Sequence, residues 1–117
     1  MTSGAPAALE KFRALCLALP DTSETLAWGH PNFKVHQKTF AVFEKYQGEW
    51  AIVFKTDLAH QRQLVDGDPR FYVSPYVGKQ GWVSMKLTGR LNWKKIERWV
   101  RDSHQRVEKK VGKKLGG

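Results

Sequence analysis

The spacing of hydrophobic residues along the chain changes from a helical period to an alternating one. Apolar residues recur at helical spacing between Leu9 and Leu19. Pro20 ends this predicted helix, because a residue before proline is disfavoured in the helical region. Aromatic and β-branched segments follow, and they predict an antiparallel meander of short strands at 25–28, 33–35, 39–45 and 50–55.

The second half of the chain predicts two more helices around a pair of strands. Asp57 is placed to cap a helix over 57–66, and strands are expected at 71–73 and 82–87. Asn92 is placed to cap the last helix. One face of that helix is predicted to be apolar and to pack on the sheet, through Trp93, Ile96, Val100 and Val107.

This order of elements predicts an α+β fold with two layers. A helix, three or four strands, a helix, two strands and a helix fit an antiparallel sheet of about five strands, covered by the N- and C-terminal helices. The 117 residues fit a single domain, 1–117, without repeats or linkers. We expect residues 1–6 to be flexible and the basic tail 109–117 to be frayed.

Composition restricts where the protein is expected to act. Cys16 is the only cysteine, so no intrachain disulfide can form. We find no leader pattern at the N-terminus, and no apolar run approaches the roughly 20 residues that span a bilayer. The sequence therefore predicts a soluble, cytoplasmic protein without a membrane partner.

The net charge of +9 is distributed unevenly. Residues 1–78 contain eight Lys/Arg and eight Asp/Glu, whereas residues 79–117 contain twelve Lys/Arg and three Asp/Glu. Such asymmetry favours polyanionic partners, of which nucleic acid is the most plausible. The alternative is that the charges only solvate a helix face and a tail.

Several segments, in order, resemble the MmcQ/YjbR family. They are PDTSET at 20–25, WGHPNFKV at 28–35, KTFA at 38–41, PYVGK at 75–79 and GWV at 81–83. The resemblance covers roughly residues 8–108 and implies a two-layer fold of the secretion-chaperone and frataxin-like kind. It also implies a DNA-binding protein with a double wing of β-hairpins.

The candidate DNA contacts are cations of the last helix, the loops and the hairpin tips. The tips at 36–38 and 45–48 are the candidate wings. We see no pattern of side chains aimed at base edges, so backbone contacts of low sequence specificity are predicted. The residues expected to make them are Lys38, Lys79, Arg90, Lys94, Lys95, Arg98 and Arg101.

Four further residues form a candidate stacking or ligand pocket: Trp28, His30, Tyr76 and Trp82. For Trp28 we favour the alternative, a core position followed by a proline-fixed kink. The loop from Tyr76 to Trp82 has two interpretations of equal weight. Its backbone N–H groups and Lys79 could bind phosphate, or its two aromatic ends could pack inward.

Catalytic motifs are not found in the sequence. The four histidines have no H-E-x-x-H spacing, and one cysteine cannot build a zinc site. No nucleophile elbow or Walker loop is present. The sequence thus predicts a non-enzymatic DNA-binding protein with no metal and no cofactor. The alternatives are a protein-interaction or chaperone-like adaptor, with a homodimer as one form, and a small-ligand binding domain.

Overall fold

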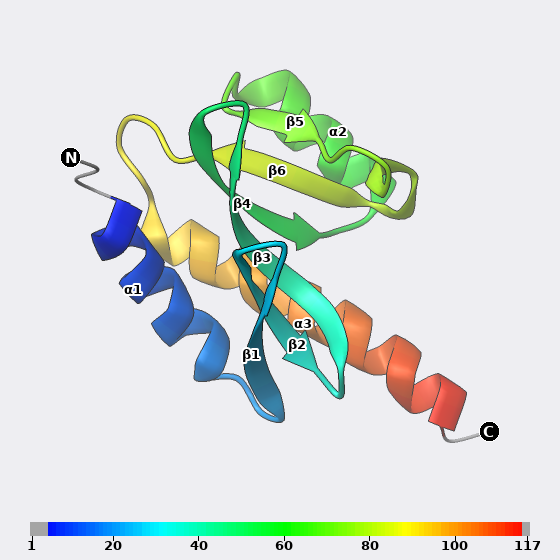
Figure 1. Ribbon diagram of the computed structural model, residues 1–117. Helices are drawn as coiled ribbons and strands as arrows, with labels where there is room; N and C mark the ends of the chain where they lie inside the picture. Colours follow the sequence, from blue (N-terminus) through cyan, green and yellow to red (C-terminus); the bar gives the residue numbers. More distant parts are fainter. Residues whose placement is uncertain (1–4, 116–117) are drawn as a thin grey trace.

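The computed structural model describes residues 5–115 (Figure 1). Their elements, in chain order, are α1 (Ala5–Leu17), β1 (Thr22–Ala27), β2 (His30–Val35), β3 (Lys38–Tyr46), β4 (Glu49–Lys55), α2 (Leu58–Gly67), β5 (Phe71–Val73), the 3-10 helix η1 (Gly78–Gln80), β6 (Trp82–Lys86) and α3 (Trp93–Leu115). The predicted order of elements is confirmed. The sheet has six strands where about five were expected.

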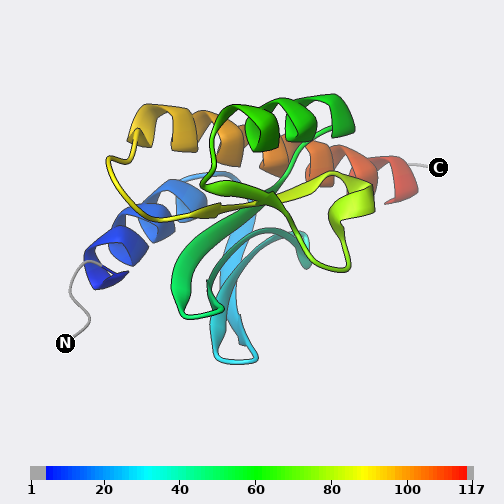
Figure 2. The same ribbon diagram turned by 90° about the horizontal axis from the view of Figure 1, so that it is seen from above.

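The sheet is antiparallel throughout, in the order β1-β2-β3-β4-β6-β5. Seen from above, α2 and α3 lie along one face, and the β1–β2 and β3–β4 turns project from the other (Figure 2). The two-layer α+β fold is therefore confirmed. One sheet face builds the core with the α-helices, and within residues 5–115 no α-helix lies over the other face.

The core lies between the helices and the inward side chains of the central strands. Phe43 and Ile52 pair across β3 and β4 and are buried, and Phe12 of α1 meets Phe33 edge to face at 5.7 Å. In α3 the predicted apolar face is confirmed, because Ile96, Val100 and Val107 are buried and Trp93 packs against this core. Trp99 of α3 also stacks on Phe54 of β4 at 5.5 Å. These contacts fix α3 across the sheet with its polar side outward.

Both predicted helix caps form. The Asp57 carboxylate accepts the backbone N–H of His60 at 2.7 Å, and the Asn92 side-chain oxygen accepts that of Lys95 at 3.1 Å. The bond from His60 is also the main reason that the pKa of Asp57 is lowered. The start of α3, and so the position of its first cations, is fixed by the Asn92 cap.

A β-bulge in β3 is closed by a side chain from α3. The β2–β3 register shifts after Phe33, so Phe40 has no direct partner on β2. The buried Ser103 hydroxyl donates to the Phe40 carbonyl at 2.6 Å and accepts the Lys55 N–H at 2.9 Å. One hydroxyl thus satisfies two backbone groups at the point where α3 crosses the sheet.

The structure differs from four expectations about local structure. Trp28 is 97% exposed rather than in the core, because it lies in the β1–β2 turn with φ 55°. The strand predicted at 33–35 begins earlier, because residues 30–32 also belong to β2. The helix α3 continues to Leu115, so most of the predicted tail 109–117 is helical. Likewise α1 begins at Ala5, within the expected flexible start, and residues 1–4 and 116–117 lie outside the described residues.

Among residues 5–115, no helix is both long and apolar enough to cross a membrane.

Candidate nucleic-acid interface and ligand groove

The outer side of α3 presents a row of exposed cations. Residues three and four apart share one side of a helix, which places Lys94, Arg98 and Arg101 in a single stripe opposite the core. Lys95 lies beside this stripe and is also exposed. Arg101 pairs with Glu97 at 3.2 Å. Because this ion pair is exposed, the attraction between the two side chains is weak. In the described part of the chain, no carboxylate pairs with Lys94, Lys95 or Arg98.

Arg90 extends this stripe beyond the start of the helix. The loop that precedes α3 is held by Arg70, whose Nη1 donates to the carbonyls of Thr88 at 2.9 Å and Arg90 at 2.8 Å. Asp68 fixes Arg70 through a contact of 2.8 Å, and this pairing lowers the pKa of Asp68. Arg90 and Lys95 line one hollow of about 420 Å³ between α2 and α3. We call Arg90, Lys94, Lys95, Arg98 and Arg101 the α3 cationic face.

The other two predicted DNA contacts lie apart from the α3 cationic face. Lys38 begins β3 and pairs with the buried Val35, so it lies on the helix-covered side near the β2–β3 turn. Lys79 belongs to η1, in the loop between β5 and β6. The second candidate wing, the β3–β4 turn, projects away from α3 (Figure 2). The five cations before and along α3 are therefore brought together, and the remaining two are not.

A second cationic hollow, which sequence reasoning missed, lies near the other half of α3. It has a volume of about 500 Å³ and is lined by Lys55, Asp102, Gln105, Arg106, Lys109 and Lys110. Partial burial, with Lys110 and Arg106 nearby, lowers the pKa of Lys55. Arg106 itself pairs with Asp102 at 2.7 Å and Asp57 at 3.2 Å. Lys55 comes from β4, so its place here could not be inferred from the helix pattern.

Several backbone N–H groups of the loop around η1 are already hydrogen-bonded. The N–H groups of Val77, Gln80 and Gly81 already donate to carbonyls within the loop. The buried Gln61 amide holds the loop from below, donating to the carbonyls of Gly78 at 2.9 Å and Trp82 at 2.7 Å. Three of the loop's amides are thus committed, which disfavours the phosphate interpretation.

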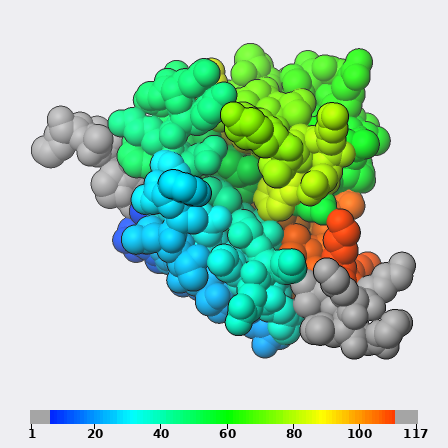
Figure 3. All heavy atoms as spheres, turned by 45° about the vertical axis from the view of Figure 1, so that its right-hand side comes forward, coloured from blue at the N-terminus to red at the C-terminus, as the bar shows by residue number. Residues whose placement is uncertain are grey.

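The helix-free sheet face contains a groove, which we call the sheet-face groove. Its volume is about 410 Å³, and its lining comes from β2, β3, β4, β6 and the segment before η1. In the space-filling view the yellow-green 74–80 segment stands beside the blue and teal strands, with the groove between them (Figure 3). The lining residues are Asn32, Thr39, Val42, Glu44, Tyr46, Val53, Ser74, Pro75, Tyr76, Val77 and Trp82.

Two of the four predicted pocket residues meet in this groove. Tyr76 and Trp82 line it, whereas Trp28 and His30 are not among its lining residues. Tyr76 is fully exposed, with φ 68°, so the expectation that both loop aromatics pack inward is wrong for it. Trp82 is half-buried.

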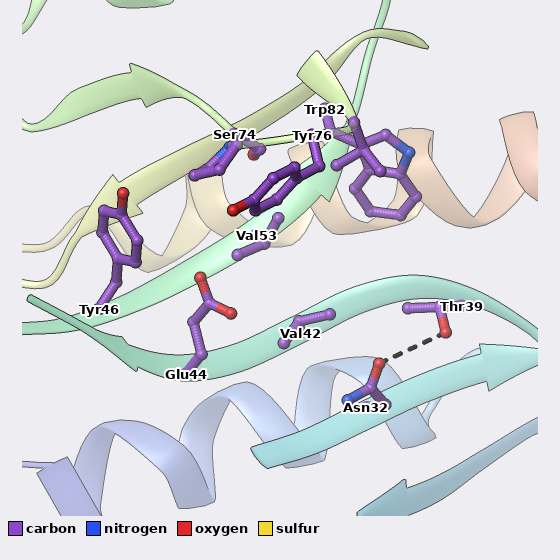
Figure 4. Close-up of a pocket in the computed structure, with 11 residues that line it drawn as sticks. Asn32, Thr39, Val42, Glu44, Tyr46, Val53, Ser74, Tyr76 and Trp82 are labelled. Atoms are coloured by element: carbon purple, nitrogen blue, oxygen red, sulfur yellow. Dashed lines mark hydrogen bonds between the residues drawn. The ribbon is translucent and has the colours of Figure 1, made fainter. Parts of the chain in front are cut away.

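The groove is chemically different from the α3 cationic face. Among the described residues that line it, Glu44 is the only charged one. Its carboxylate and the Tyr76 hydroxyl point into the same space above Val53 (Figure 4). Tyr46 lines one end and stacks on Tyr72 at 5.6 Å. A carboxylate among aromatic rings suits a cationic or neutral ligand and repels phosphate.

A third group of side chains was not found from the sequence. Asp21, His36 and Glu108 come from the α1–β1 turn, the β2–β3 turn and α3, and their ligand atoms lie within 4.8 Å of one another. They are far apart along the chain, so no local spacing rule detects them. Only the packing of the two turns against α3 brings them together.

The fold and these surfaces define a small two-layer α+β protein with a cationic helix and a grooved sheet. The family model of YjbR matches residues 17–106, and the chain belongs to this family, which confirms the resemblance found in the sequence. No curated protein matches the sequence.

Solved structures with a similar fold include the following two. Deinococcus radiodurans protein DR2400, described as a DUF419 domain, has a TM-score of 0.78 and 23% identity, covering 92% of this chain and 87% of its own. A protein from Pseudomonas syringae has a TM-score of 0.67 and 22% identity, covering 82% and 95%. At these identities the comparisons show the fold alone.

Proposed function

We propose that the protein is a non-enzymatic DNA-binding protein of low sequence specificity and that the α3 cationic face is its contact surface. The observation that supports this most is the exposed row of cations on one side of α3, with three of them outside any ion pair in the described residues. Exposed cations that carry no carboxylate partner are available to phosphates.

The dimensions of this face fit a nucleic-acid backbone. Lys94 and Arg101 are seven residues apart, which is about 10 Å along a helix that rises 1.5 Å per residue. One strand of a duplex advances about 3.4 Å per phosphate, so the stripe spans several phosphates. Arginine and lysine on phosphates position a protein without selecting a sequence. Low sequence specificity therefore belongs to the proposal.

Reversing two charges in the centre of the face tests this proposal. We expect the double variant Lys94→Glu, Arg98→Glu to bind a labelled DNA duplex at least about tenfold more weakly at low salt, because two phosphate contacts become repulsive. Fluorescence anisotropy of the duplex measures the affinity. Both positions are exposed, so the variant should keep its circular dichroism spectrum.

The matched control reverses two cations on the helix-free side. Lys34 pairs with Thr39 of the sheet-face groove, and Lys86 pairs with Ala51 on that same side. The variant Lys34→Glu, Lys86→Glu changes the net charge equally. If it weakens duplex binding as much as the α3 variant does, binding follows net charge alone and the proposed contact surface is wrong.

A second candidate function, small-ligand binding, is favoured by the sheet-face groove. The groove brings the exposed Tyr76 together with Trp82 and Glu44. Such a set suits an organic ammonium ion, which the aromatic rings and the carboxylate would bind. We expect choline to quench Trp82 fluorescence more than its uncharged carbon analogue 3,3-dimethylbutanol does. Replacing Glu44 with Gln should remove this difference, and equal quenching in the unmodified protein would exclude a cation site.

A further inference from the structure

We propose that Asp21, His36 and Glu108 form a binding site for one divalent transition-metal ion of the Zn²⁺ class. Imidazole nitrogen and carboxylate oxygen are both ligands that Zn²⁺ uses, and three protein ligands leave a position for water. The proposal rests on the convergence of these side chains from three elements and does not depend on DNA binding.

The distances between ligand atoms are close to those of a zinc site. His36 Nε2 lies 3.8 Å from Asp21 Oδ2 and 3.6 Å from Glu108 Oε2. Bonds of about 2.0–2.1 Å in tetrahedral geometry place neighbouring ligand atoms about 3.3 Å apart. The two distances from His36 Nε2 thus exceed this spacing by a few tenths of an ångström, and the three ligand atoms all lie within 4.8 Å of one another. All three side chains are partly exposed, so an ion can reach them from solvent.

A buried histidine of α3 lies beside Glu108 and bonds to the residue before Asp21. His104 Nε2 lies 2.8 Å from the Pro20 carbonyl oxygen, and since a carbonyl only accepts, this nitrogen holds the proton. The other ring nitrogen, Nδ1, lies 3.9 Å from Glu108 Oε1, beyond hydrogen-bond distance. The His104 side chain is only 4% exposed.

The same histidine positions the proposed ligands. Its bond to Pro20 ties α3 to the residue that precedes Asp21, and its other side faces Glu108. An outer residue that orients metal ligands in this way is common in zinc sites. A bound ion would link the α1–β1 turn, the β2–β3 turn and α3 at this place.

The donor set also predicts which ions bind. One nitrogen and two carboxylates suit Zn²⁺ and similar transition metals, whereas Mg²⁺ and Ca²⁺ require six or more oxygen ligands. Isothermal titration of the tag-free protein with Zn²⁺ is expected to show one equivalent bound, and millimolar Mg²⁺ should not compete. Zn²⁺ should also raise the urea midpoint of unfolding, because only the folded chain brings the ligands together.

Two conservative variants decide the proposal. His36→Gln and Glu108→Gln should each weaken Zn²⁺ binding by about 10-fold or more and abolish the shift of the urea midpoint. His30→Gln is the matched control, because His30 lies in β2, outside the cluster, and its loss should leave Zn²⁺ binding unchanged. Circular dichroism without metal checks that each variant folds. The proposal is overturned if the unmodified protein binds no Zn²⁺, or if His36→Gln and Glu108→Gln bind it as the unmodified protein does.

Discussion

Replacing Gly81 by alanine is expected to lower the free energy of unfolding by about 2–5 kcal/mol. Gly81 has φ 97°, a left-handed conformation that costs other residues about 1–2 kcal/mol. A Cβ atom there would also overlap the carbonyl oxygen of Thr56, and overpacking costs a further 1–3 kcal/mol or so. Since the Thr56 N–H donates to the Gly81 carbonyl at 2.8 Å, the two backbones cannot easily separate. Urea denaturation followed by circular dichroism measures the loss.

Gly29→Ala separates the two contributions to this loss. Gly29 also has a positive φ, 80°, but nothing lies within 4 Å of a Cβ built on it. Only the conformational cost remains, so a loss of about 1–2 kcal/mol is expected. If both variants are destabilised equally, the close approach of the 74–81 loop to Thr56 has no energetic role. Gly81→Ala should in addition disturb the sheet-face groove, because Tyr76 and Trp82 flank this loop.

Ser103→Ala is expected to lower the free energy of unfolding by about 2–6 kcal/mol. The variant leaves the Phe40 carbonyl and the Lys55 N–H without a partner in a buried place, and each unsatisfied group costs about 1–3 kcal/mol. The side chain itself shrinks by one oxygen, so loss of packing is a small part of the effect. Chemical denaturation again gives the value.

Ser23→Ala is the control for the serine change. Ser23 is exposed on β1, and surface substitutions of this kind change stability by less than about 0.5 kcal/mol. A Ser103→Ala protein as stable as Ser23→Ala would show that the bulge does not need the α3 hydroxyl. The stability of this contact matters for function, because Ser103 joins α3 to the sheet and so helps to fix the α3 cationic face.

Much of the fold could be predicted because its determinants are local. Asp57 and Asn92 end up as helix caps, and alternation in β3 and β4 places Phe43 and Ile52 in the core. The wrong predictions lie where residue type and local backbone conformation indicate different positions. Trp28 looks like a core residue by type, yet a two-residue turn with Gly29 places it in solvent.

The candidate sites could be predicted only in part, for a similar reason. The row of cations on α3 follows from helical periodicity alone. Neither Lys55 beside Arg106 nor His36 beside Glu108 is visible in the sequence, because β4 and the β2–β3 turn reach α3 only through the packing of the sheet. The bulge at Phe40 and its partner Ser103 depend on the same packing.

The central claim is that phosphates bind to the α3 cationic face, and the salt dependence of duplex affinity tests it most directly. Five contacts predict a log–log slope of about −4 to −5 for the unmodified protein, and the loss of two contacts reduces the slope by about 2 in the Lys94→Glu, Arg98→Glu variant. A duplex affinity that does not change with salt, or a slope that is the same in both proteins, would contradict the claim.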